Sequence, residues 1–163
     1  MKYIKNLFLI GLGVAVVAVG CKKDEESTPT PTKTDLLCGK TYKMTGMIVN
    51  PGIDTGSGSA VTDIWPLIEA CSKDDEFTFK TSGKVTTDEG ASKCVATDPQ
   101  SYDEDWKFVS NESVIEITEK DSKKKNYTII TLNGTDLKLS YTETDSSVTP
   151  PVSRTYTVTS KKK

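Results

Sequence analysis

The chain of 163 residues contains no histidine. This absence removes the most common general base for a serine or cysteine nucleophile, and it removes the imidazole ligand of many zinc sites. The chain has 4 cysteines, but their wide and irregular spacing matches no zinc-binding pattern. We therefore expect no catalytic residues, no metal ion and no cofactor, and we expect that the protein is not an enzyme.

An excess of positive charge is also missing. Lysine and arginine together number 21 against 23 aspartates and glutamates, which gives a formal net charge of -2. Proteins that bind nucleic acid neutralise phosphates with clustered basic residues, so no nucleic-acid partner is expected. The 35% hydrophobic and 27% charged content is typical of an ordinary folded domain, and the length fits one domain.

Clusters of like charge are present, but none defines a reaction. Carboxylates gather at residues 74–76, 88–89 and 103–105, where they could act as glycosidase acids or hold calcium. Solvated carboxylates at strand ends also keep sheet edges from pairing with other chains, and we favour that interpretation. The lysine run 123–125 could bind lipopolysaccharide phosphates, but a charged hairpin tip is the simpler interpretation.

The longest apolar run lies near the N-terminus. A short basic segment at 1–5 precedes apolar residues 7–19, which are too few to span a bilayer with ease. This pattern predicts a signal peptide at 1–20. Residues 18–21 resemble the lipobox of bacterial lipoproteins, and this resemblance implies that Cys21 is acylated and anchored in a lipid bilayer. An ordinary signal peptide, or an uncleaved anchor with an incidental cysteine, is the alternative.

A tether is predicted between Cys21 and the folded domain. Residues 22–26 resemble the acidic export signal of lipoproteins in Gram-negative anaerobes. This resemblance implies an outer-membrane protein that faces the cell exterior, with the periplasmic face as the alternative. Alternating proline and threonine then favour an extended polyproline II segment. We thus divide the chain into a signal peptide (1–20), an acylated cysteine with a Pro/Thr-rich tether (21–34), one domain (35–160) and a frayed C-terminus (161–163).

The centre of the domain is predicted to be a β-hairpin within residues 71–94. Two phenylalanines alternate with polar residues at 77–80, and a serine-glycine turn follows at 82–83. Residues at similar distances from such a turn lie close together, so we favour a disulfide between Cys71 and Cys94. We expect the remaining thiol of the domain to be a buried, unreactive side chain.

Alternating apolar residues continue around 106–108, 115–117, 127–129, 137–141 and 156–158. Short strands with polar turns predict an all-β barrel or sandwich, and a count of about eight strands favours a closed antiparallel barrel. Residues 64–71 allow one short helix before the second strand. Residues 50–60 are rich in glycine and serine, and we expect a mobile loop there.

Several motifs follow one another between residues 36 and 159. They are the Leu-x-x-Gly-Lys-x-Tyr sequence at 36–42, the acidic and phenylalanine pattern after Cys71, then Cys94, Trp106 with Phe108, and the leucines at 137–139. In this order they resemble the lipocalin-like domain of surface lipoproteins from Gram-negative anaerobes. The resemblance implies an up-and-down barrel and no catalytic residues.

Seven aromatic residues are candidate ligand-binding residues of such a barrel: Trp65, Phe77, Phe79, Trp106, Phe108, Tyr127 and Tyr141. They could line a cavity for a small apolar or amphipathic molecule, but the same rings could fill a dry core, which we favour. Trp65 could instead cap the barrel or form a surface patch. Two functional hypotheses follow for a monomeric domain: a ligand-binding barrel, or a filled barrel whose loops contact glycans or proteins.

Overall fold

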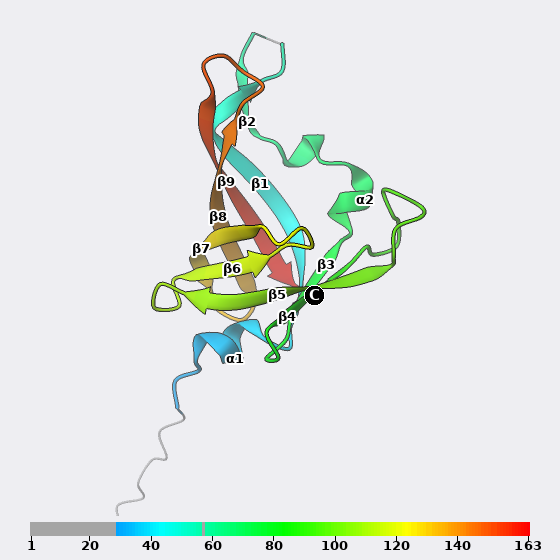
Figure 1. Cartoon of the computed structure of the whole chain (residues 1–163), viewed down its shortest axis with the longest axis vertical. Coiled ribbons are helices and arrows are strands. Elements are labelled where there is room, and N and C mark those ends of the chain that lie inside the picture. Colours follow the sequence, from blue (N-terminus) through cyan, green and yellow to red (C-terminus); the bar gives the residue numbers. More distant parts are fainter. Residues whose placement is uncertain (1–28, 57) are drawn as a thin grey trace, which may run out of the picture.

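Residues 29–56 and 58–163 are described in the computed structural model of the chain (Figure 1). The predicted signal peptide, Cys21 and the first part of the tether lie outside these residues. The described strands are β1 (Thr41–Asp54), β2 (Ala60–Asp63), β3 (Glu76–Phe79), β4 (Lys84–Asp88), β5 (Ser101–Val109), β6 (Val114–Thr118), β7 (Lys124–Leu132), β8 (Asp136–Asp145) and β9 (Val152–Lys162). The described helices are α1 (Lys33–Leu37), the 3-10 helix η1 (Trp65–Leu67) and α2 (Ala70–Lys73).

Eight of these strands form a closed antiparallel barrel. Strands β3 to β9 pair in sequence order, and β1 pairs with both β3 and β9, so the sheet closes on itself. Strand β2 pairs with β1 through Ile48 with Asp63, Ile53 with Val61 and Asp54 with Ala60. Closure leaves the barrel strands without free edges. The predicted all-β class and the eight-stranded up-and-down barrel are therefore confirmed.

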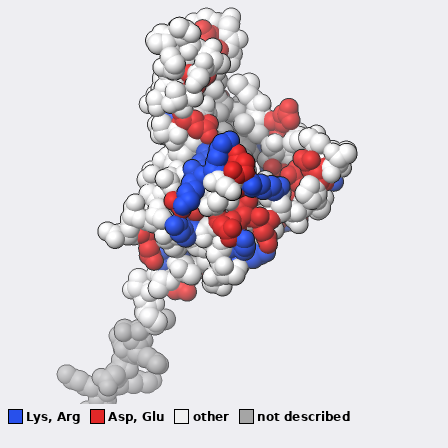
Figure 2. Space-filling model, viewed as in Figure 1, with Lys and Arg blue, Asp and Glu red and all other residues white. Residues whose placement is uncertain are grey.

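The period-two pattern of the sequence decides which face of each strand is buried. In β5, Trp106 is buried while its neighbours on either side are exposed, because successive side chains of a strand point to opposite faces. Outward-facing groups form cross-strand ion pairs, namely Lys80 with Asp103, Lys84 with Asp105 and Lys107 with Glu116. Figure 2 shows basic and acidic side chains interspersed over the body of the molecule, so opposite charges lie next to each other on this face.

One end of the barrel is closed. The strands there are joined by short turns, and Leu37 of α1 is fully buried against them in the core. A capping box starts this helix: Thr32 Oγ1 accepts a hydrogen bond from the amide of Asp35 at 3.1 Å, and the Asp35 carboxylate accepts one from the amide of Thr32 at 2.9 Å. Helix α1 therefore includes Lys33 and Thr34, which were predicted to belong to the tether.

The C-terminus also lies at the closed end. Strand β9 continues to Lys162, which pairs with Tyr42 of β1. The amide of Lys163 donates to the carbonyl of Thr41 at 3.0 Å, and its ammonium forms an ion pair with Glu76 at 2.6 Å. The prediction of a frayed end at 161–163 was therefore wrong, because pairing with β1 extends the last strand beyond its apolar residues.

The opposite end, which we call the mouth, carries the longer connections. Elements β2, η1 and α2 lie between β1 and β3, residues 89–100 join β4 to β5, and residues 146–151 join β8 to β9. In Figure 1 the β1–β2 hairpin and the adjoining ends of β8 and β9 rise beyond the rest of the barrel. Long connections are therefore concentrated at one end of the fold.

The loop predicted to be mobile at 50–60 is mostly strand, and that prediction was wrong. Arg154 is buried on β9, and its Nη1 donates to the carbonyls of Pro51, at 2.9 Å, and of Gly52. Its Nε donates to Asp145 Oδ2 at 3.3 Å. These contacts between residues far apart in sequence hold β1 in an extended conformation despite the low strand propensity of proline and glycine.

The single helix expected at 64–71 is present as two short pieces, η1 and α2. Ile68 and Glu69 between them have extended backbones, with ψ angles of 137° and 147°. Asp63 Oδ1 accepts a hydrogen bond from the amide of Trp65 at 3.1 Å and so fixes the start of η1. In the part of the chain that is described, no helix has the length and apolar character needed to cross a membrane.

Candidate ligand cavity

A cavity of about 330 Å³ lies inside the barrel and extends toward the mouth. Its floor is formed by four buried side chains: Tyr42, Phe79, Val85 and Leu137. Further apolar or aromatic side chains form its wall: Met44, Met47, Phe77, Ile117, Tyr127, Leu139 and Val158. Ligand sites in proteins measure about 300–1,000 Å³, so this cavity is at the small end of that range.

The floor rests on a packed core at the closed end. The ring of Trp106 meets those of Phe79 and Phe108 edge to face, with centroid distances of 5.3 and 5.1 Å. The indole nitrogen of Trp106 donates to two backbone carbonyls of the β3–β4 turn at 3.1 Å each. The hydroxyl of Tyr42 donates to the carbonyl of Leu36 at 2.9 Å. Because these polar atoms are paired, the floor can be buried without an unsatisfied donor.

Two methionines of β1 face the cavity although they lie three residues apart. The pairing of β1 with β9 shifts register between Met44 and Gly46. Because of this irregularity, the side chain of Met47 also points into the barrel, where Met47 lies opposite Val158. Methionine side chains are flexible and polarisable, so this part of the wall can adapt to apolar groups of different shapes.

Two carboxylates line the cavity at the mouth. Glu104 lies on β5 and Glu119 directly follows β6. Burial raises the pKa of Glu104, and the neighbouring Glu119 carboxylate raises it further. The ammonium group and the backbone amide of Lys120 act in the opposite direction. The same ammonium stands 3.6 Å from the centre of the Tyr102 ring, so carboxylates, an aromatic face and a cation meet at this rim.

The tyrosines around the cavity and its mouth are protonated at neutral pH. Burial raises the pKa of Tyr102 and of Tyr127 above the ordinary value of a phenol. Burial likewise raises the pKa of Tyr141 to about 12. Each of these hydroxyl groups therefore keeps a proton that it can donate in a hydrogen bond.

Three of the seven candidate ligand-binding residues line the cavity: Phe77, Phe79 and Tyr127. Trp106 and Phe108 instead lie in the packed core beneath the floor. The dry core favoured in the sequence analysis thus describes the closed half of the barrel, whereas the half toward the mouth is hollow.

The other two candidates lie away from the cavity lining. The ring of Tyr141 stacks on that of Tyr156 with a centroid distance of 5.1 Å, and Lys125 places its ammonium 3.9 Å from the centre of the Tyr141 ring. Trp65 is half-buried in η1, with the ammonium of Lys73 at 5.3 Å from its ring centre. Neither ring contributes to the cavity surface.

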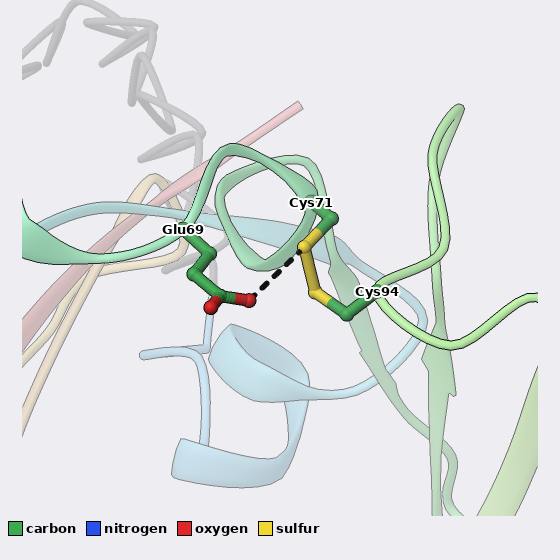
Figure 3. A group of neighbouring side chains, drawn as sticks. All are labelled: Glu69, Cys71 and Cys94. Atoms are coloured by element: carbon green, nitrogen blue, oxygen red, sulfur yellow. Dashed lines mark hydrogen bonds between the residues drawn. A yellow bond between two sulfur atoms is a disulfide. The ribbon is translucent and has the colours of Figure 1, made fainter.

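The predicted disulfide between Cys71 and Cys94 is present (Figure 3). It joins α2 to the connection between β4 and β5, and the Cα atoms of the two cysteines are 5.2 Å apart. The carboxylate of Asp74 accepts hydrogen bonds from the amides of Ala91 and Ser92 at 2.8 and 2.9 Å in the same connection. Two long connections of the mouth are therefore fastened to each other.

Glu69 lies beside this disulfide in Figure 3, with its Oε2 3.6 Å from Cys71 Sγ. These three side chains are close enough together to suggest metal ligands. A cysteine must be a thiolate to bind a metal, and a disulfide sulfur is neither a thiolate nor a proton donor. The group therefore does not form a metal site while the disulfide is intact.

Cys38, the remaining thiol of the domain, is half-buried and unpaired, in contact with the core at the closed end. Burial raises the pKa of this thiol, and the charge of Lys40 opposes the shift in part. A raised pKa lowers the thiolate fraction at neutral pH, which agrees with the expected structural role of this cysteine.

Neither carboxylate of the mouth was predicted from the sequence. Residues 103–105 were predicted to be a solvated acidic cluster, which is correct for Asp103 and Asp105 on the outer face. Glu104 lies between them and two residues before the buried Trp106, so the period of the strand turns it inward. Alternation counted back from Trp106 is the signal that could have identified it.

These features define a class of proteins: closed antiparallel barrels with an internal cavity at one end. A family model described as the lipocalin-like domain matches residues 39–139. This segment is more than half of the chain, and the chain therefore belongs to the lipocalin-like domain family. The match ends within β8, ahead of the strand that closes the barrel against β1. No curated protein and no solved structure matches the chain.

Proposed function

We propose that the protein is a membrane-anchored lipoprotein whose barrel binds a small apolar or amphipathic ligand. The observation that carries this proposal is the cavity of about 330 Å³ with an apolar floor and wall. The packed core seals the closed end, so a ligand enters through the mouth. The family is generally non-catalytic, and we assign the barrel to binding rather than to a reaction.

A matched pair of substitutions tests binding inside the barrel. Val158 lines the cavity, whereas Ile130 is 54% exposed on the outside. Val158→Phe fills the cavity and should abolish the fluorescence increase of an anilinonaphthalene probe with the full chain, while Ile130→Phe should leave it unchanged. Native mass spectrometry of the purified wild-type chain should show a bound small molecule that is missing from Val158→Phe. Equal probe binding by both variants would exclude the interior as the site.

We further propose that the protein lies in the outer membrane and faces the cell exterior, with the sequence of residues 1–21 supporting the anchor and that of residues 22–26 supporting the outer face. Helix α1, near the start of the described chain, lies at the closed end, so the described chain begins at the end opposite the mouth (Figure 1). Metabolic labelling with radioactive palmitate should label the wild type and Cys38→Ser but not Cys21→Ser. Protease added to intact cells should remove the domain, and full protection would place it on the periplasmic face instead.

A second candidate function is supported by the projecting hairpin of β1 and β2. Near it, Ile48 and Leu67 are 51% and 61% exposed, close to the half-buried Trp65. Exposed apolar side chains of this kind are suited to contact a glycan or a protein partner. In that case Trp65→Ala should abolish binding to immobilised surface polysaccharide or outer-membrane protein, and Val158→Phe should not. The opposite pattern would favour the cavity.

A further inference from the structure

The charged groups of the cavity all have the same sign. Of the side chains that line it, only Glu104 and Glu119 are ionisable at neutral pH, and neither lysine nor arginine is among them. Within residues 29–56 and 58–163, no lysine or arginine forms an ion pair with either carboxylate. The mouth therefore presents negative charge to any molecule whose apolar part occupies the floor.

The surroundings add to this negative charge. Asp75, which precedes β3, and Glu89, which follows β4, act on Tyr102 together with Glu104. The lysines beside Glu119 are paired with other carboxylates: Lys123 with Asp121 at 2.5 Å, Lys124 with Glu116 at 3.2 Å and Lys125 with Glu143 at 2.5 Å. An anionic head group would meet the carboxylates of a cavity that no lysine or arginine lines, so a fatty acid is disfavoured.

Lys120 shows what kind of group fits at the rim. Its ammonium lies on the face of Tyr102, 3.6 Å from the ring centre, beside the Glu104 carboxylate. The side chain is exposed and lines a shallow depression beside the cavity together with both glutamates. Because the side chain of Lys120 is long and flexible, its ammonium can move away from the Tyr102 ring at little cost in free energy. An alkylammonium ion from a ligand would make the same cation–π and charge contacts from inside the cavity.

We propose that the ligand is an amphiphile with a cationic head, an aliphatic amine, whose tail contacts the floor and whose ammonium lies between Glu104 and Glu119 in place of Lys120. This inference rests on the proposed function and names its ligand class. The apolar wall supplies most of the affinity, and the two carboxylates select the head group.

Three ligands with ten carbon atoms each test the proposal: decylamine, decanol and decanoate, titrated calorimetrically into the full chain at concentrations at which each is monomeric in solution. Decylamine should bind on the order of tenfold or more tightly than decanol, and decanoate should bind most weakly. In the double variant Glu104→Gln and Glu119→Gln, the amine should lose this advantage while decanol keeps its affinity. Glu112→Gln, at an exposed turn of the closed end, is the matched control and should behave as the wild type. Lys120→Met should strengthen amine binding, because the competing ammonium is gone.

The outcomes separate this inference from the proposed function. If decanol binds but decylamine binds no better, or if the double variant keeps the amine preference, the cationic-head inference is wrong and the cavity proposal stands. If none of the three ligands binds to the wild type, and the anilinonaphthalene probe also fails, both proposals are wrong. Retention of decanol binding by the double variant shows that it is folded.

Discussion

The two ends of the barrel are built from the same strands but differ in almost every other respect. The closed end has short turns, the helix α1 and a core in which Tyr42, Ile115 and Leu37 are fully buried. The mouth has long connections, a cavity and inward-facing carboxylates. Strands that pass from one environment to the other change their inward residues accordingly, as β5 does from Glu104 to Trp106.

This difference suggests that the stability of the fold depends mainly on the closed end, whereas binding depends mainly on the mouth. Burial of apolar side chains at the closed end provides most of the stability, because each fully buried side chain contributes about 1.5–3 kcal/mol. The mouth can then keep polar and charged groups in positions that a fully packed barrel would fill. Changes at the closed end should therefore affect folding, and changes at the mouth should mainly affect binding.

The two tryptophans give the largest predicted contrast. Trp106→Ala removes a ring packed between two phenylalanines, and it should lower the free energy of unfolding by about 3–5 kcal/mol. Trp65→Ala removes a half-buried ring near the mouth and should cost about 1 kcal/mol. Urea unfolding followed by circular dichroism measures both. Equal losses in the free energy of unfolding for the two variants would contradict the claim that the closed end provides most of the stability.

The disulfide is the main stabilising device expected at the mouth. Replacing Cys71 and Cys94 together with serine frees a loop closed over a sequence separation of 23. The chain-entropy model predicts a loss of about 3 kcal/mol, and measured losses are often smaller. Cys38→Ser, as a control for the chemical change, should cost about 1 kcal/mol. A double variant as stable as the wild type under oxidising conditions would show that the disulfide does not stabilise the mouth.

Replacing Asp75 should change the free energy of unfolding by a smaller amount, and it should stabilise the protein rather than destabilise it. Asp75 precedes β3 at the mouth, its Oδ1 is buried without a hydrogen-bond partner among the described residues, and burial together with Glu89, Asp74 and Asp88 raises its pKa to about 6. Because the folded-state pKa is above the unfolded value of about 3.9, ionisation destabilises the fold as the pH rises through about 6.

Asp75→Asn removes this ionisation and should stabilise the protein by about 1 kcal/mol at pH 7.5, a value reduced for partial exposure. The gain should vanish near pH 3.5, where the wild-type carboxyl is protonated in both states. Asp98→Asn, in an exposed part of the same region, should have no effect at either pH. Thermal unfolding at the two pH values measures the difference, and an equal gain at both would point to a cause other than charge.

Much of the closed end could be predicted from the sequence, because local patterns determine it. Alternation around Trp106 and Ile115 identified strands and their buried faces, and each of these signals lies within a few residues of the feature that it predicts. At the mouth, the disulfide between Cys71 and Cys94 was also predicted, because both cysteines flank one hairpin.

The mouth was predicted less well, because contacts between distant residues determine it. Nothing near Pro51 and Gly52 indicates a strand, and the hydrogen bonds that hold them come from Arg154. The cavity also depends on how side chains of many strands fill space, which alternation does not specify. A one-residue register shift in β1 brings both Met44 and Met47 inward, and such shifts leave little trace in a single sequence.

The central claim is that the hollow half of the barrel holds the ligand, and the methionines allow a direct measurement. The chain has 3 methionines, of which Met44 and Met47 line the cavity. With ¹³C-labelled methionine methyl groups, decylamine should shift the signals of both, assigned through Met44→Leu and Met47→Leu. Binding that leaves the signals of Met44 and Met47 unmoved would contradict the account.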